Sequence, residues 1–309
     1  MDDEYIVPVY AVFDDLAKAF LEPVKYNPKM TVAEIMTVAV VAARYFNNNH
    51  ERALIMMYQT GYIAPARRLS VSRFNRQVHK YADFLAFCLD SLLELCRVGE
   101  AFVIDSMPLP VCKRVRARRC RKVRGQDYCG YCAAKKEKFF GWRLHLICTP
   151  NGIPVAFSVL PASYHDLTPI FELSAELPPD ATLYGDKGYN YADGEHFLAD
   201  EGLRLVPIRK KNMQPHPWAD EYDLRLYRKG IETRNSQLES MALDRLHART
   251  NAGFDIKVQA SLIALWHTQI LANSVDPKLD SQWRYRSNNA NAGIVAPFNR
   301  PANEVANAA

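Results

Sequence analysis

Three short acidic motifs, far apart in the sequence, most constrain what this chain can fold into. They are Ile-Asp-Ser at 104–106, Gly-Asp-Lys-Gly-Tyr at 185–189 and Ile-Glu-Thr at 231–233. Each stands where a different strand or helix is expected to begin or end, so one fold could bring all three together. Convergent carboxylates predict a divalent-cation site, because hard cations such as Mg²⁺ take oxygen ligands.

Length and composition indicate a globular protein of about two domains. Of the 309 residues, 49% are hydrophobic, which is ample for a buried core. The sequence has no uncharged apolar run of about 18 residues, and its first residues are acidic where a secretory signal is basic. We therefore expect a cytoplasmic protein with no membrane partner. Its seven cysteines are an odd number, which disfavours a disulfide scaffold.

Residues 1–97 are predicted to form an all-α N-terminal domain. Thr31 is the expected N-cap of a buried helix at 32–46, with Glu34 completing a capping box. Helices at 51–60 and 73–96 follow, and their sequence resembles a helix-turn-helix that would bind DNA. A plain helical bundle is the alternative. The expected DNA contacts of the second helix are Arg73, Arg76 and Lys80.

Residues 98–273 are predicted to form an α/β core. Asn151-Gly152 separates two apolar runs and is a strong hairpin signal. The strands are expected at 101–105, 139–149, 153–160, 182–186 and 203–208, and the helices at 167–177, 192–201, 221–241 and 256–273. This order predicts a ribonuclease-H-like core, a mixed five-stranded sheet with flanking helices. The tail at 274–309 lacks periodicity and is predicted to be disordered.

The acidic residues have both a catalytic and a plain interpretation. Asp105 and Asp186 end the first and fourth predicted strands, and ligands bind outside the carboxyl ends of strands in α/β sheets. Alternatively, they merely terminate strands. Glu232 shares a helix face with cations, which also fits a surface salt-bridge ladder. Glu239, seven residues on, is the rival third carboxylate.

Together the motifs resemble a DDE transposase of bacterial insertion sequences, specifically the group named for insertion sequence 982. The resemblance covers about residues 30–272 and includes Ile-Asp-Ser, the run Phe-Gly-Trp-Arg-Leu-His-Leu at 140–146, His165-Asp166, Gly-Asp-Lys-Gly-Tyr and Arg-x-x-Ile-Glu-Thr from 228. The chain departs from it at Arg225 and Glu239, where Tyr and Lys are common, and at Asn235, where an aromatic residue is often seen.

The resemblance implies that Asp105, Asp186 and Glu232 form a catalytic triad that binds two Mg²⁺ ions, with Mn²⁺ as an alternative. It implies cleavage of double-stranded DNA at the element's ends, transfer of the strand to target DNA, and a homodimer or larger assembly on DNA. The expected location is bacterial and nucleoid-associated. A nuclease without strand transfer and a non-catalytic DNA-binding protein are the alternative functions.

Basic residues are concentrated beside the predicted site. Residues 101–150 contain twelve Lys/Arg and three Asp/Glu, a local charge of +9, which favours contact with phosphate. Further DNA contacts are expected from the basic arm at 113–124, the second acidic motif and the charged helix at 221–241. They are Lys113, Arg114, Arg116, Arg118, Arg119, Lys187, Arg225, Arg228 and Lys229.

Two other patterns have less specific interpretations. Cys112, Cys120, Cys129 and Cys132 could bind zinc, but the spacing of the first pair is wrong for a zinc ribbon, so zinc is not expected. Asp166 precedes a predicted helix and is expected to be its N-cap, with a role beside the metal as the alternative.

Overall fold

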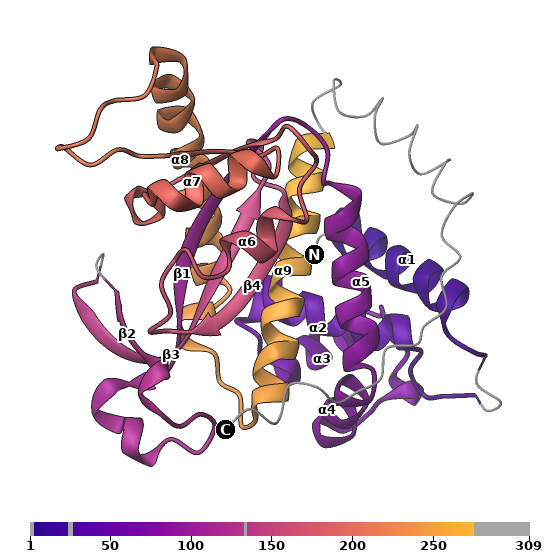
Figure 1. Ribbon diagram of the computed structural model, residues 1–309. Coiled ribbons are helices and arrows are strands. Elements are labelled where there is room, and N and C mark those ends of the chain that lie inside the picture. The colour runs from indigo at the N-terminus through magenta and orange to yellow at the C-terminus, as the bar shows by residue number, and fades with distance from the viewer. Residues whose placement is uncertain (1–2, 24–26, 133–134, 275–309) are drawn as a thin grey trace. The chain divides into compact units, whose positions relative to one another are not determined.

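The computed structural model describes residues 3–23, 27–132 and 135–274 (Figure 1). The chain divides into two units, Met1–Ile270 and Leu271–Ala309. The predicted disordered tail lies outside the described residues apart from Ser274, which ends the last helix.

Residues in the N-terminal third are helical, as predicted. The helices are α1 (Asp3–Phe20), α2 (Val32–Phe46), α3 (His50–Gln59), α4 (Val71–Lys80) and α5 (Ala82–Leu95), with the 3₁₀ turn η1 (Pro65–Arg67) before α4. The capping box at Thr31 and Glu34 is present, and α2 is buried along most of its length. Arg67 closes over this cap, because its guanidinium donates to both Glu34 carboxylate oxygens at 2.6 Å.

The single helix predicted at 73–96 is wrong, because the chain breaks at Tyr81 into α4 and α5. The break lets the two halves pack against different partners: α4 contacts α2 and α3, whereas α5 contacts strand β4 (Pro154–Pro161). The connection between α3 and α4 spans residues 60–70, longer than the three- to four-residue turn of a helix-turn-helix.

The core is a mixed sheet with the order expected for a ribonuclease-H-like fold. Its other strands are β1 (Ala101–Lys113), β2 (Cys129–Cys132), β3 (Glu137–Cys148), β5 (Thr182–Gly185) and β6 (Arg204–Pro207). Strand β3 pairs antiparallel with β1, β2 and β4, while β1, β5 and β6 pair in parallel. The predicted hairpin joins β3 to β4, and Gly152 takes the left-handed φ of 82° that its turn requires.

Two details of the sheet differ from the prediction. The sheet has six strands in the described part of the chain, since short β2 adds to the five expected. Strand β1 does not end at Asp105 but continues to Lys113. Past Ile104 this strand pairs with β3 alone, so Pro108 and Pro110 lie where one edge carries no partner strand and a missing N–H is tolerated.

Helices flank the sheet. They are α6 (Ile170–Ser174), α7 (Ala192–Asp200), α8 (Trp218–Ser240) and α9 (Asn251–Ser274). Helix α8 packs against β1, β5 and β6, α7 against β6, and α6 against β4. Helix α9 joins the N-terminal helices to the core, because Tyr5 donates to its Ala264 carbonyl at 3.1 Å and Gln269 donates to Gln237 of α8 at 3.0 Å.

The remaining elements are short 3₁₀ turns: η2 (Arg114–Arg119), η3 (Gln126–Tyr128), η4 (Lys187–Tyr189) and η5 (Leu243–Arg245). In Figure 1, η2, η3 and β2 form a lobe at one end of the sheet. Among the described helices, none is both long enough and apolar enough to cross a membrane.

Gly141 on β3 should tolerate no side chain. A Cβ there would lie 2.4 Å from the Leu109 carbonyl oxygen and 2.6 Å from the Val111 nitrogen, both backbone atoms of β1. We expect Gly141→Ala to lower the free energy of unfolding by at least about 2 kcal/mol, measured by urea denaturation.

The matched control is Gly230→Ala, in the middle of α8, where the nearest atom to an added Cβ is the Pro150 carbonyl oxygen at 3.5 Å. This substitution should stabilise the protein by about 0.5–1 kcal/mol through helix propensity. Equal effects of the two substitutions would contradict the close approach of β1 and β3.

Candidate active site

The first two acidic motifs meet because β1 and β5 pair in parallel. The last pair in register is Ile104 with Gly185, so Asp105 and Asp186 are the next residue on each strand. After Asp186 the turn η4 folds back, and the buried Tyr189 ring packs against Gly185, where a Cβ would lie 3.0 Å from the ring. The motif Gly-Asp-Lys-Gly-Tyr is therefore a compact turn that presents Asp186 to solvent.

The third motif is carried to the same place by α8. Leu224, Ile231 and Leu238 are buried at seven-residue spacing and dock the helix on the sheet. Tyr184 of β5 strengthens the contact by donating to Asp223 at 3.2 Å. Glu232, beside Ile231, consequently lies at the edge of the helix that borders β1 and β5.

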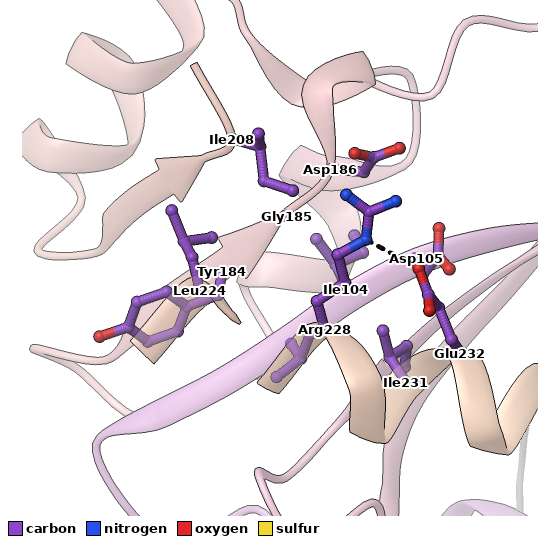
Figure 2. A pocket seen from close by; sticks show the side chains of 11 residues that line it. Ile104, Asp105, Tyr184, Gly185, Asp186, Ile208, Leu224, Arg228, Ile231 and Glu232 are labelled. Atoms are coloured by element: carbon purple, nitrogen blue, oxygen red, sulfur yellow. Dashed lines mark hydrogen bonds and ion pairs between the residues drawn. The ribbon is translucent and has the colours of Figure 1, made fainter. Parts of the chain in front are cut away.

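Asp105, Asp186 and Glu232 line one cavity, together with Arg228 and apolar residues of β1, β5 and α8 (Figure 2). Its volume is about 40 Å³. That is room for an ion or a few water molecules, since one water needs roughly 10–15 Å³ on this measure. A nucleobase does not fit.

Asp105 is the most desolvated acid of this cavity. Its pKa is raised to about 7, mainly by burial. The Ser106 N–H, which donates to Oδ1 at 2.8 Å, lowers the pKa, whereas the nearby charges of Asp186, Asp166 and Glu232 raise it. Asn235 donates to the other oxygen, Oδ2, at 2.8 Å. Asn235 was not among the predicted site residues, although it lies one helical turn beyond Glu232 on the same helix.

Arg228 supplies the positive charge of the cavity. Its Nε donates to Glu232 Oε1 at 2.7 Å, and this hydrogen bond is the main cause that raises the pKa of Arg228. Asp186 and Asp105 act in the same direction, and Figure 2 shows the guanidinium between Asp186 and the other two acids. Arg228 was predicted to contact DNA, but here its partner is the candidate catalytic carboxylate.

The donor chemistry of this cavity fits a hard divalent cation. Three carboxylates line one small space, and the pKa of Asp105 is raised first by burial and then by the neighbouring acids, so a cation there would offset both effects. Within the described ranges, however, no three His, Cys, Asp or Glu side chains are gathered closely enough to hold a metal ion. Glu232 is instead turned to Arg228, so its carboxylate would have to exchange partners to become a ligand.

Asp166 supports the site from the other face of β1. It accepts from Ser106 Oγ at 3.0 Å and from Arg143 Nη1 at 3.4 Å. It also lies against the η4 turn, where a Cβ on Gly188 would be 2.9 Å from Asp166 Oδ2. The predicted N-cap role is wrong, since α6 begins at Ile170 with Pro169 as its N-cap.

The rival Glu239 lies elsewhere. It forms an ion pair with Lys135 at 2.9 Å and lines a different groove, not the cavity of Asp105. The other predicted DNA contacts are exposed, although Lys113 is paired with Glu137 at 3.5 Å. These exposed residues lie on α4, η2, η4 and α8: Arg73, Arg76, Lys80, Arg114, Arg116, Arg118, Arg119, Lys187, Arg225 and Lys229.

The four cysteines near the basic turn are free thiols. Cys112 and Cys129 face the same β3 residue, Phe140, from opposite sides of that strand, which keeps them two strands apart. Cys112 instead contacts Cys120, which adds to the burial that raises the pKa of Cys112.

Comparison with known proteins assigns the chain to a family. Residues 96–251, half of the chain, match the sequence pattern described as "Transposase DDE domain". The chain belongs to the DDE transposase family. It is therefore a transposase and an enzyme, and DDE transposases generally use divalent metal ions. The narrower assignment to the insertion sequence 982 group stays a prediction.

Two solved transposase structures are similar at low identity. One is a piggyBac transposase synaptic complex with hairpin DNA, with 10% identity and a TM-score of 0.43, covering 88% of this chain and 74% of that one. The other is a pre-cleavage Mos1 transpososome, with 11% identity and a TM-score of 0.22, covering 74% and 82%. No curated protein sequence matches the chain.

The pKa of Asp105 makes the stability of the metal-free transposase depend on pH. Because burial raises this pKa from 3.8 to about 7, the folded protein binds the proton more tightly than the unfolded chain does. The resulting stabilisation is complete below pH 3.8 and is lost as the pH rises through about 7. Asp105→Asn, which cannot ionise, should therefore gain stability relative to wild type between pH 5 and pH 8.

Thermal unfolding in EDTA measures this effect. Glu239→Gln, outside the cavity, is the control and should show no such gain. A constant difference between Asp105→Asn and wild type across this pH range would show that Asp105 ionises normally.

Proposed function

We propose that this transposase cleaves DNA at the ends of an insertion element and joins the exposed 3′-hydroxyl to target DNA at the cavity of Asp105, Asp186 and Glu232. One observation supports this site. The parallel register of β1 and β5 brings Asp105 and Asp186 side by side, and Glu232 of α8 lines the same cavity. A divalent cation bound there would polarise the attacking and leaving oxygens of a phosphodiester. We propose Mg²⁺, with Mn²⁺ as the alternative.

In this proposal each residue has a distinct task. Asp105 is the fixed ligand, because the Ser106 N–H and the Asn235 amide hold its two oxygens. Asp186 approaches from the adjacent strand. Glu232 would be the third ligand once its hydrogen bond to Arg228 is broken, and the guanidinium would then be free to bind the scissile phosphate beside the cavity.

The small volume of the cavity decides where the DNA lies. Because about 40 Å³ admits an ion but no base, the scissile phosphate must bind at the cavity mouth with its bases outside. Exposed Lys187, Arg225 and Lys229 come from the two elements that carry Asp186 and Glu232, and we propose that they contact the flanking phosphates.

The domain organisation follows the same proposal. Residues 1–97 would recognise the element's ends through exposed Arg73, Arg76 and Lys80 of α4, and residues 98–273 would carry out the chemistry. Double-stranded DNA is the proposed partner, and an assembly of at least two copies on DNA would hold both ends during transfer.

The catalytic assignment predicts a sharp contrast between two glutamates on α8. Asp105→Asn, Asp186→Asn and Glu232→Gln should each reduce Mg²⁺-dependent cleavage by at least about a thousandfold, because each removes a charged ligand. The matched control is Glu239→Gln, the same change two helical turns further along α8, and this variant should retain wild-type cleavage. The measurement is cleavage of a plasmid that carries the element's ends.

The same reaction separates the possible outcomes. Joined products show strand transfer, whereas nicked or linear plasmid alone would identify a nuclease. Loss of cleavage in Glu239→Gln with retention in Glu232→Gln would move the third carboxylate to Glu239.

The basic turn η2 should contribute to DNA binding without reading sequence. Arg116, Arg118 and Arg119 are exposed there. If each neutralises one phosphate, their replacement by Ala should reduce the slope of log K against log salt concentration by about 2.7, or 0.9 for each contact. Fluorescence anisotropy over a salt titration measures the slope, and an unchanged slope would place η2 away from the DNA.

A further inference from the structure

A second, much larger groove lies at the C-terminal end of α8, beyond the catalytic cavity, and is not used by the proposed chemistry. Its volume is about 970 Å³. One wall is the turn between α2 and α3, the start of α3 and one face of α4, and the other is the end of α8, η5 and the start of α9. In Figure 1 the lower, N-terminal end of α9 lies near α3 and α4. A ring atom of His79 on α4 would lie 3.6 Å from a Cβ added to Gly253 of α9.

The walls carry more positive than negative charge, because Arg52, Arg245, Arg249 and Lys257 line the groove against Glu51 and Glu239. Arg52 on one wall and Arg249 on the other are exposed, and no ion pair is recorded for either among the residues described. Burial lowers the pKa of Lys257, and the nearby charge of Lys122, in the basic arm, lowers it further. The Lys122 carbonyl accepts from Asn251 at 3.0 Å, so the arm reaches the end of the groove.

The floor of the groove is polar and aromatic. Asn48, only 1% exposed, donates through Nδ2 to the Met241 carbonyl and to Ser261 Oγ, and its Oδ1 has no partner. Asn48 belongs to the turn between α2 and α3, and its backbone is in the left-handed region, with φ of 61°. A side-chain oxygen buried without a donor costs free energy, which a ligand N–H could recover.

His50 adds a second acceptor to this floor. Its Nδ1 lies 2.8 Å from Asn75 Oδ1, and because that oxygen can only accept, Nδ1 must carry the proton. Nε2 is then a bare acceptor, and it has no partner. Four rings, those of Phe46, His50, His79 and His247, line the groove.

We propose that this groove binds single-stranded DNA, one or more unpaired nucleotides that the transposase holds apart from the duplex; this inference rests on the proposed DNA substrate. Cationic walls over aromatic rings suit a phosphate backbone with stacking bases. The two bare acceptors match the amino groups on base edges. The volume exceeds that of one nucleotide but cannot admit a duplex.

The position of the groove gives the unpaired strand a defined route. It lies between α4, the helix proposed to bind the element's end, and the basic arm that follows β1. A strand that leaves the duplex near α4 would therefore pass along the start of α9 towards the arm.

The test compares two duplexes of one mixed sequence, one blunt and one with a four-nucleotide 3′ overhang, by fluorescence anisotropy with the full chain in EDTA. Wild type should bind the overhang duplex about tenfold more tightly, as expected if one or two bases stack. Arg52→Ala/Arg249→Ala should lose this preference. Lys18→Ala/Lys29→Ala, which removes the same charge from exposed residues outside the groove, should retain it.

Two results would overturn the inference: equal binding of both duplexes by wild type, or an overhang preference that survives in Arg52→Ala/Arg249→Ala. Thermal unfolding checks that both double variants are folded. Since no metal is present, a failure of this test is independent of the cleavage assay on Asp105 and Asp186.

Discussion

The parallel pairing of β1 with β5 is the constraint on which the candidate catalytic cavity depends. Pairing stops at Ile104 and Gly185, and each strand then presents an aspartate at the same level. A shift of one residue in this register would turn one aspartate to the opposite face of the sheet. The helix that brings Glu232 depends on the same strands, because its buried Leu224 and Ile231 pack on them.

Charge in the cavity is balanced by two different means. Burial and neighbouring acids raise the pKa of Asp105 to about 7, so near neutral pH it is partly protonated. Arg228 compensates the charge of Glu232 by a direct ion pair. Protonation of Asp105 and pairing of Glu232 therefore both lessen the repulsion among the three acids, and a cation bound beside them would favour the reverse of both.

Local signals in the sequence predicted much of this fold. The Thr31 and Glu34 capping box and the Asn151-Gly152 hairpin act through neighbouring residues, and both are present. The extension of β1 was missed because Pro108 and Pro110 normally argue against a strand. Their tolerance depends on where β5 ends, which is a property of the sheet and not of the local sequence.

The candidate site was predictable in its acids but not in what holds them. Asp105, Asp186 and Glu232 come from motifs, and the structure brings them to one cavity. The Asn235 hydrogen bond to Asp105 and the link from Ser106 to Asp166 join residues 130 and 60 positions apart, which no local pattern records. The length of β1 also connects two features, since the strand runs from Asp105 to Lys113, just before η2, with one register shift between Pro110 and Cys112. Eight residues of strand span about 26 Å, close to the length of eight base pairs of B-DNA. The strand thus acts as a spacer of fixed length, and a duplex that touched both ends would have its cleaved phosphate and its non-specific contacts separated by a set number of base pairs.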